Sequence, residues 1–331
     1  MKPTGLFALD EPSFGRVYSL DQRAAIGQVV ELVGPRQSGE DLREDAASLA
    51  NAELLFSGWG GPLLDSALLD HAPKLTCVFF AAGSVRQIMT QAAWQRGIRI
   101  TSAFAANAIP VAEFTVSQIV FCLKLGWQHL ELMKQRQRWE HLPEVPGAFG
   151  STVGLVSLGQ VGQRVCRMLR QYDVRVLAFD PFVSSDLATD LKVELVDLET
   201  VFVESDVVSL HTPDLPETQR IITGQHITAM KPQASLINTA RGAIVNEPEL
   251  IGVLQERQDL VAVLDVTVGE PPEPSSLLWT LPNAILLPHI AGSMDRECHR
   301  MGQCMVDELR RYLAGQPLLG EITQEMASRL A

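Results

Sequence analysis

The chain has 331 residues, of which 46% are hydrophobic and 20% charged, and this composition predicts a globular protein of about two domains. Asp and Glu outnumber Lys and Arg by 39 to 27, and the net charge of -12 argues against nucleic acid or an anionic membrane surface as the main partner. The five cysteines form no C-x-x-C pair, which predicts neither a disulfide framework nor a metal site and favours the reducing cytoplasm. Charged residues near the N-terminus argue against a secretory signal, and no apolar stretch is long and uncharged enough to predict a membrane span.

The first part of the chain alternates short apolar segments with amphipathic or polar stretches, a pattern that predicts β-α units around a parallel sheet. The expected strands are 4–9, 52–57, 75–81 and 98–103. An apolar-periodic stretch then predicts one long helix over about 110–135, opened by Asn107 and Pro110. Prolines and glycines in 138–150 end this periodicity and predict a loop.

The second part of the chain repeats the β-α pattern more regularly. Its expected strands are 152–157, 174–179, 206–210, 234–238, 261–265 and 284–287. These strands are almost continuously apolar, which is typical of a parallel sheet covered by helices on both faces. The sequence therefore predicts an α/β protein with a doubly wound sheet.

A dinucleotide-binding turn is predicted directly after the first strand of this second series. Set against G-x-G-x-x-G, the sequence places Ser157 at the first position, Gly159 at the second and Gly162 at the third. The second glycine lets a pyrophosphate approach the backbone, and the third lets the helix pack closely on the strand. Asp180 ends the next strand, where its carboxylate would accept hydrogen bonds from the ribose hydroxyls, which favours NAD. With one glycine lost, a plain strand-to-helix turn without a ligand is the alternative.

Three further segments each place a polar residue shortly after an apolar strand, where open α/β sheets bind ligands. Arg241 could hold a substrate carboxylate and polarise a carbonyl, because its planar guanidinium keeps its charge. His289 could donate a proton to the forming alkoxide and take it back in the reverse direction. Glu270 could pair with the imidazole, orient it and favour its protonated form.

In this order the segments resemble the D-isomer-specific 2-hydroxyacid dehydrogenases over nearly the whole chain. The resemblance is carried by KLTCVFFAAGSV, GIRITSAFAANAIPVAEFTV, SDVVSLHTPDLPET, MKPQASLINTARGAIVNEPELI, LDVTVGEP, LPNAILLPHIAGS and GQPLLGEIT. It implies NAD-dependent interconversion of a 2-keto acid and a D-2-hydroxy acid, with Arg241, Glu270 and His289 as the catalytic residues. It also implies two Rossmann-like doubly wound domains: a discontinuous substrate domain (1–104 and 297–331) and an inserted NAD-binding domain (105–296), with the active site in the cleft.

The resemblance assigns the cofactor to the turn and to loops that follow later strands. The implied residues are Ser157, Gly159, Gln160, Val161, Gly162, Asp180, Thr212, Pro213, Thr239, Ala240, Arg241, Asp265, His289 and Gly292. Asp265 would lie beside the nicotinamide carboxamide. His211 belongs to one of these loops, and we expect it to be a structural or cofactor-loop residue rather than the proton donor.

The segment Ala82, Gly83, Ser84 matches the turn whose backbone amides hold the substrate carboxylate in this family, together with Arg241. The chain departs from the family pattern at Ser84, where a glycine is common, and at Arg86, where an aspartate is common. Arg86 would contact the substrate, pair with a carboxylate across the cleft, or be a solvated surface charge. Asn107 matches an asparagine near the active site and could equally be a helix cap.

Several questions stay open on the sequence alone. Family members are commonly dimers joined through the cofactor domain, so a homodimer is expected. A dinucleotide-sensing interaction protein of the same fold is the alternative function, and Ser157 keeps it open. A formate-oxidising enzyme is disfavoured by Glu270, since the Glu-His pair serves a substrate oxygen that gains and loses a proton. The motifs fit glyoxylate, hydroxypyruvate, a bulkier keto acid or a dicarboxylate.

Overall fold

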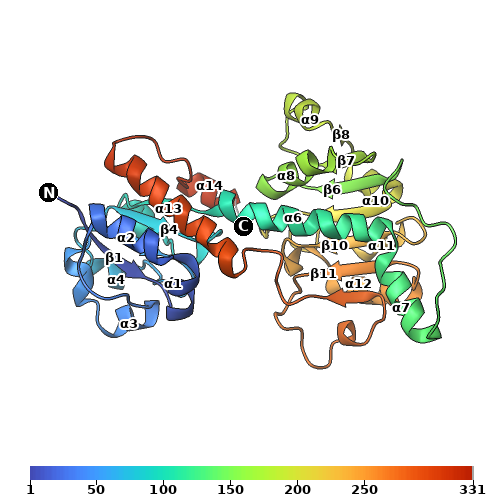
Figure 1. The fold of residues 1–331 in the computed structure, drawn as a ribbon, viewed down its shortest axis with the longest axis horizontal. Coiled ribbons are helices and arrows are strands. Elements are labelled where there is room, and N and C mark those ends of the chain that lie inside the picture. Colours follow the sequence, from blue (N-terminus) through green and yellow to red (C-terminus); the bar gives the residue numbers. More distant parts are fainter. Residues whose placement is uncertain (330–331) are drawn as a thin grey trace. The chain divides into compact units, whose positions relative to one another are not determined.

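The computed structural model describes residues 1–329 and divides the chain into two compact units (Figure 1). The first unit contains Met1–Asn107 and the described residues from Ser293 onward, and the second contains Ala108–Gly292. Each unit is built around one parallel sheet with helices beside it. The prediction of an α/β fold with two Rossmann-like units is confirmed.

The sheet of the first unit has five parallel strands in the order β2-β1-β3-β4-β5. The strands are β1 (Thr4–Ala8), β2 (Glu31–Leu32), β3 (Leu54–Ser57), β4 (Cys77–Phe80) and β5 (Arg99–Ser102). Side chains alternate between the two faces, since Leu6 packs into the hydrophobic core on one side and Phe7 into the core on the other. The carboxyl ends of the parallel strands therefore share one edge of the sheet.

Short helices cover both faces of this sheet. They are α1 (Glu11–Val17), α2 (Leu20–Val29), α3 (Gly39–Glu44), α4 (Ser66–Asp70), α5 (Gln91–Gln95), α13 (Cys298–Leu313) and α14 (Gln324–Arg329). The first three begin at side-chain caps, where Asp10, Ser19 and Ser38 each accept a hydrogen bond from a backbone N–H of the first turn. Local sequence therefore decides where these helices begin.

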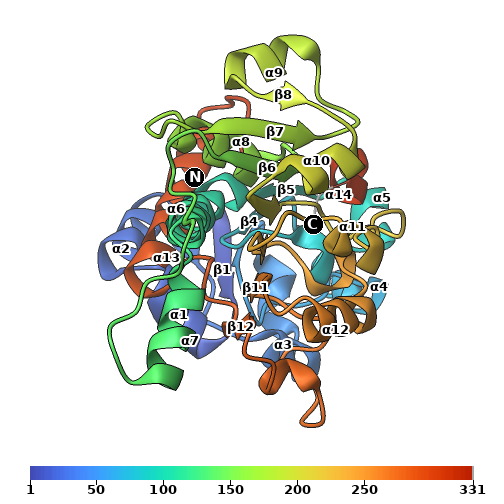
Figure 2. The same ribbon diagram turned by 90° about the vertical axis from the view of Figure 1, so that its right-hand side faces the viewer.

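The sheet of the second unit has seven parallel strands in the order β12-β11-β10-β9-β6-β7-β8, seen from another side in Figure 2. The strands are β6 (Thr152–Val156), β7 (Arg175–Phe179), β8 (Glu194–Leu195), β9 (Val207–Leu210), β10 (Ser235–Asn238), β11 (Val261–Leu264) and β12 (Ala284–Leu286). Its helices are α8 (Gln160–Leu169), α9 (Ser185–Leu191), α10 (Leu198–Glu204), α11 (Gly224–Thr228) and α12 (Glu247–Glu256). The strand order reverses direction between β6 and β9, which is where doubly wound sheets bind ligands.

The long helix predicted over about 110–135 is wrong in its bounds, because two helices occupy this stretch. Helix α6 (Phe104–Leu123) begins before Pro110, where the Ser102 hydroxyl accepts a hydrogen bond from the Phe104 amide. Helix α7 (Gly126–Arg136) follows after Leu125, whose φ of 50° is left-handed. Leu125 is buried, so its packing favours a backbone turn that hydrophobic periodicity does not reveal.

Helix α6 is long and apolar enough to cross a membrane by length and composition alone, and 56% of its most apolar window is buried within the protein. On sequence alone, the charge of Glu113 within this stretch argues against a membrane span. A buried core helix of a globular unit has the same length and composition.

Candidate active site

The dinucleotide-binding turn has the backbone that its glycine pattern requires. Ser157, at the first glycine position, has a φ of 77°, in the left-handed region that favours glycine. A Cβ atom on Gly162 would overlap the carbonyl oxygen of Ser157, so only glycine lets α8 pack this closely on the turn. A Cβ on Gly159 would meet no atom within 4 Å, which leaves the backbone at the start of α8 open to a ligand. Gln160 and Val161 form the first turn of the same helix.

Asp180 lies after β7 and is tied directly to this turn. One carboxylate oxygen accepts a hydrogen bond from the Leu158 amide at 2.7 Å, and the other accepts one from the Phe182 amide at 2.8 Å. Each carboxylate oxygen can accept a further hydrogen bond, so a ribose hydroxyl could still bind. Asp180 therefore holds the turn in place, a role that the sequence pattern did not indicate.

We expect Ser157→Gly to raise the free energy of unfolding by about 0.5–1 kcal/mol, since relief of the left-handed serine outweighs the backbone entropy lost by glycine. Chemical denaturation would measure the change. Ser157→Ala is the matched control, because it keeps the Cβ atom and should give no gain. Equal stability of the glycine and alanine variants would contradict the explanation.

The loops after β9 and β10 bring the predicted cofactor residues to the same sheet edge. Thr212 is buried, and its hydroxyl donates to the Val156 carbonyl at 3.4 Å. The carbonyl of Pro213 accepts a hydrogen bond from the Thr218 hydroxyl at 2.6 Å. The hydroxyl of Thr239 lies 2.9 Å from the hydroxyl of Thr115 on α6. The sequence pattern did not indicate that Thr115 lies near these loops.

His211, directly after β9, has an imidazole nitrogen that is buried beside these loops. Its backbone amide donates to the Val156 carbonyl at 2.8 Å, which places it directly beside the turn. Its Nε2 atom is buried and has no hydrogen-bond partner among residues 1–329. Such an atom needs a partner, and the open Gly159 backbone and the Asp180 carboxylate lie on loops of the same edge. These residues fit a bound dinucleotide.

Burial lowers the pKa of His211 to about 4, below its ordinary value of 6.5. The unfolded chain therefore binds a proton between these two values that the folded chain does not bind. The free energy of unfolding should fall as the pH drops through this window, by up to about 1.4 kcal/mol per pH unit from this group. In His211→Asn the loss of stability between pH 7 and pH 5 should be smaller than in the wild type. Equal losses, measured by denaturant unfolding at both pH values, would contradict this account.

Arg241 lies in a tightly built turn after β10. The side-chain amide of Asn238 donates to the Arg241 carbonyl at 2.9 Å, and its oxygen accepts a hydrogen bond from the Ala240 amide at 3.0 Å. The Arg241 guanidinium donates to the Ala240 carbonyl at 2.6 Å. A Cβ on Gly242 would overlap the Thr267 backbone, so this turn packs directly on the loop that follows β11. Asn238, the first residue of the segment NTARG, thus fixes the backbone of the turn through its side chain. The sequence pattern did not indicate this role.

The predicted proton-transfer pair is in direct contact. Nδ1 of His289 lies 2.7 Å from a carboxylate oxygen of Glu270, and the two side chains are 50% and 43% exposed. His289 has a φ of 54°, a conformation that costs a non-glycine residue free energy and is often found at functional sites. Because Glu270 occupies Nδ1, the other ring nitrogen, Nε2, is the atom that could exchange a proton with a substrate.

Asp265 holds the backbone beside His289. It is buried, and its two carboxylate oxygens accept hydrogen bonds from the amides of Ile290 at 2.8 Å and Ala291 at 2.9 Å. Its carbonyl also accepts a hydrogen bond from the His289 amide at 3.0 Å. Three hydrogen bonds thus join Asp265 to consecutive residues 289–291, directly before Gly292. The sequence predicted a nicotinamide contact at Asp265, and the structure adds that the carboxylate positions the histidine segment.

The predicted carboxylate turn lies after β4 in the first unit. The Ser102 hydroxyl contacts the carbonyl oxygens of Ala82 at 2.8 Å and Gly83 at 2.6 Å. Since N–H and C=O point in opposite directions across a trans peptide, the amides of Gly83 and Ser84 point away from Ser102. Neither amide donates a hydrogen bond within the part of the chain that the structure describes. Two adjacent unpaired amides among small side chains could bind an anion.

Asn107 lies beside this turn in the first turns of α6. Its side-chain oxygen accepts a hydrogen bond from the Ser293 amide at 3.1 Å, and its side-chain nitrogen would be 3.7 Å from a Cβ on Gly83. The alternative role as the cap that opens a helix is wrong, because α6 begins before it. Arg86 follows the turn, and its side chain contacts backbone carbonyls of α14.

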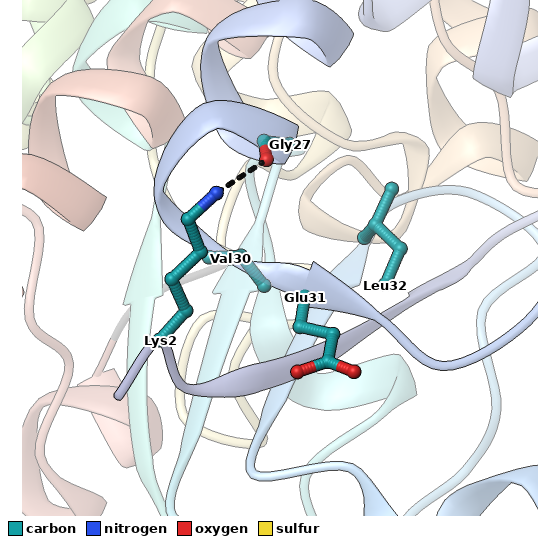
Figure 3. A pocket seen from close by; sticks show the side chains of 5 residues that line it. All are labelled: Lys2, Gly27, Val30, Glu31 and Leu32. Atoms are coloured by element: carbon teal, nitrogen blue, oxygen red, sulfur yellow. Dashed lines mark hydrogen bonds between the residues drawn. The ribbon is translucent and has the colours of Figure 1, made fainter.

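A surface hollow lies elsewhere in the first unit. It is open, and Lys2, Gly27, Val30, Glu31 and Leu32 line it (Figure 3). Lys2 donates to the Gly27 carbonyl across it at 3.4 Å. Lys2 precedes β1 and therefore lies at the amino edge of the sheet, opposite the edge that carries the carboxylate turn. Among residues 1–329 no group of three or more acidic, histidine or cysteine side chains could hold a metal ion.

Comparisons with known proteins show which family the chain is similar to. The sequence model for the NAD-binding domain of D-isomer-specific 2-hydroxyacid dehydrogenases matches residues 120–291. The glyoxylate reductase of Thermofilum pendens is 32% identical over 259 residues, which cover 76% of each chain. The D-3-phosphoglycerate dehydrogenase of Methanocaldococcus jannaschii is 30% identical over 254 residues, 75% of this chain and 48% of that protein. The chain thus spans about half the length of the phosphoglycerate dehydrogenases it matches.

A solved structure supports the shared fold. The apo D-mandelate dehydrogenase of Rhodotorula graminis has a TM-score of 0.81 at 21% identity, with 98% of each chain covered. The matched domain is an NAD-binding domain, and NAD is the cofactor, as the sequence predicted. The chain therefore belongs to the family of D-isomer-specific 2-hydroxyacid dehydrogenases.

Proposed function

We propose that this protein is an NAD(H)-dependent oxidoreductase that interconverts a 2-keto acid and a D-2-hydroxy acid. The observation that carries the proposal is the contact of 2.7 Å between Glu270 and His289, at the carboxyl edge of a sheet that belongs to an NAD-binding domain. A protein that only sensed the dinucleotide would have no need of a paired proton donor.

The residues of the second unit would act on the carbonyl group. When bound, NADH supplies the hydride for reduction. Arg241 would polarise the keto oxygen and bind the adjacent carboxylate, because its guanidinium presents several donors in one plane. His289 would donate a proton from Nε2 to the substrate oxygen and take it back in the reverse direction. Glu270 would hold the ring through Nδ1 and stabilise its positive charge.

The substrate carboxylate would also bind the unpaired amides of Gly83 and Ser84. The absence of bulky side chains at Ala82, Gly83 and Ser84 allows a ligand to approach this backbone closely. Asn107 would support the turn from the side, since its amide nitrogen lies near Gly83.

The proposal is tested by following NADH oxidation with a panel of 2-keto acids, from glyoxylate and hydroxypyruvate to phenylpyruvate, with NADPH in parallel. Turnover with NADH on at least one of them, giving the D product, is the expected result. NADH binding with no turnover on any member would instead favour the dinucleotide-sensing alternative.

We further propose that the protein is a cytoplasmic homodimer. Apolar side chains are exposed on α7 and the loop after it, including Leu130 at 45%, Trp139 at 86% and Phe149 at 85%. A second copy of the chain would cover such a surface. The cysteines of the described residues are free thiols, in keeping with a reducing compartment. Sedimentation should give twice the mass of the chain, and Trp139→Glu should shift it toward the monomer.

A further inference from the structure

The C-terminal segment of the first unit is docked close to the carboxylate turn. Its Ile322 is buried in the core, and its amide donates to the Ile100 carbonyl at 2.9 Å. Helix α14 follows, and Ala327 packs against the same core. The Gln324 side chain donates to that of Gln91 on α5 at 2.9 Å. Helix α14 therefore has a defined place on the first unit.

Arg86 binds the carboxyl end of this helix. Its Nε lies 3.4 Å from the Ala327 carbonyl and its Nη2 lies 3.3 Å from the Ser328 carbonyl. The last carbonyls of a helix lack partners within the helix and form the negative end of its dipole. A guanidinium is well suited to this position, because it is cationic and has several donors.

Arg86 also lies at the end of the carboxylate turn. The turn is held at its start by Ser102, whose hydroxyl contacts the Ala82 and Gly83 carbonyls. It ends in the 3₁₀ turn Val85–Gln87, where Val85 is buried and Arg86 reaches α14. The Gly83 and Ser84 amides thus lie between one anchor on β5 and another on the C-terminal helix.

We propose that Arg86 is a positioning residue that ties α14 to the carboxylate turn and so holds the Gly83 and Ser84 amides ready for the substrate carboxylate. The proposal rests on the function proposed above for these amides. It gives Arg86 a role that the sequence reading did not consider, because the side chain acts through backbone carbonyls of α14. Removing the Arg86 side chain or distorting α14 should therefore weaken substrate binding more than it slows the chemical step.

The test compares variants on both sides of the contact in the full-length protein. Arg86→Ala and Ala327→Pro should each raise KM for the best keto acid about tenfold, with kcat and the Kd for NADH changed less than about twofold. Ala327→Gly weakens the same helix more mildly and should give a smaller increase. Arg86→Lys should restore part of the lost affinity. The double variant Arg86→Ala/Ala327→Pro should be no worse than either single variant, since both remove one contact. Arg43→Ala, an exposed arginine of α3, is the matched control.

Backbone 15N order parameters of Gly83 and Ser84 provide a second measurement that needs no turnover, because they report how rigidly the turn is held. They should be lower in Arg86→Ala and in Ala327→Pro than in the wild type. A raised KM in Arg86→Ala alone, with no effect of Ala327→Pro, would mean direct contact between Arg86 and substrate and would overturn the proposal. Unchanged order parameters in both variants would overturn it as well. If no keto acid is turned over, the proposed function fails, while the order parameters still decide whether α14 holds the turn.

Discussion

Replacing His289 with Ala should lower kcat for keto-acid reduction by about a thousandfold, within the range expected for loss of a general acid. The Kd for NADH should change little. The physical reason is that His289 is the imidazole paired with Glu270, whereas burial lowers the pKa of His211 in the neighbouring loop to about 4, which keeps that imidazole neutral near pH 7. Stopped-flow and steady-state rates, with NADH binding followed by fluorescence, would measure both quantities.

Two controls separate loss of the proton donor from general damage. Glu270→Gln keeps a hydrogen-bonding side chain beside Nδ1 but removes the negative charge, so its kcat should fall between those of the wild type and His289→Ala. His211→Asn should keep far more activity than His289→Ala. Equal turnover by His289→Ala and the wild type would refute the mechanism, and a complete loss in His211→Asn alone would move the proton donor to that residue.

Asp265→Asn should lower kcat by about a hundredfold without unfolding the protein, as expected when a catalytic group is displaced by about 1 Å. Asp265 joins two backbone amides after His289, and an asparagine can accept only one of those hydrogen bonds because its other terminal group is a donor. We also expect a loss of about 1.5–3 kcal/mol in the free energy of unfolding, the size measured for hydrogen bonds to charged groups.

Asp259→Asn is the matched control for this substitution. Asp259 lies in the same unit and accepts a hydrogen bond from the Gln233 amide, and it also pairs with Arg257. The Arg257 guanidinium lowers the pKa of Asp259, so the variant should lose some stability but keep its kcat. If both variants lost stability equally and neither lost turnover, Asp265 would be a structural residue with no influence on His289.

Much of the fold and the candidate site could be predicted because the signals are local. The inner strands of the second sheet are buried on both faces, so each is a nearly continuous apolar run that can be recognised without its neighbours. Polar residues directly after such runs come to one edge because parallel strands all end there. The pattern therefore drew attention to Arg241, Glu270 and His289 one by one, and the resemblance to the dehydrogenase family grouped them as catalytic residues.

The features that the sequence did not reveal depend on contacts between distant parts of the chain. Strands β2 and β8 have two residues each and are exposed, so hydrophobic pattern gives no signal for them. The break at Leu125 lies where that side chain is buried and where a Cβ atom on the following Gly126 would overlap the Phe121 ring, a contact that hydrophobic periodicity does not report.

The sequence by itself thus determined the fold class and the NAD-binding turn, because apolar runs and glycine spacing report local backbone requirements. The set of candidate catalytic residues came from the resemblance of its motifs to the dehydrogenase family. Only the tertiary structure decided what those residues contact. In the structure, Asp265 accepts a hydrogen bond from the backbone after His289, and Asp180 accepts one from the turn before α8. Arg86 donates to a carbonyl at the end of α14. A hydrogen bond between residues far apart in the chain depends on how the elements pack, and no local pattern of amino acids specifies that packing.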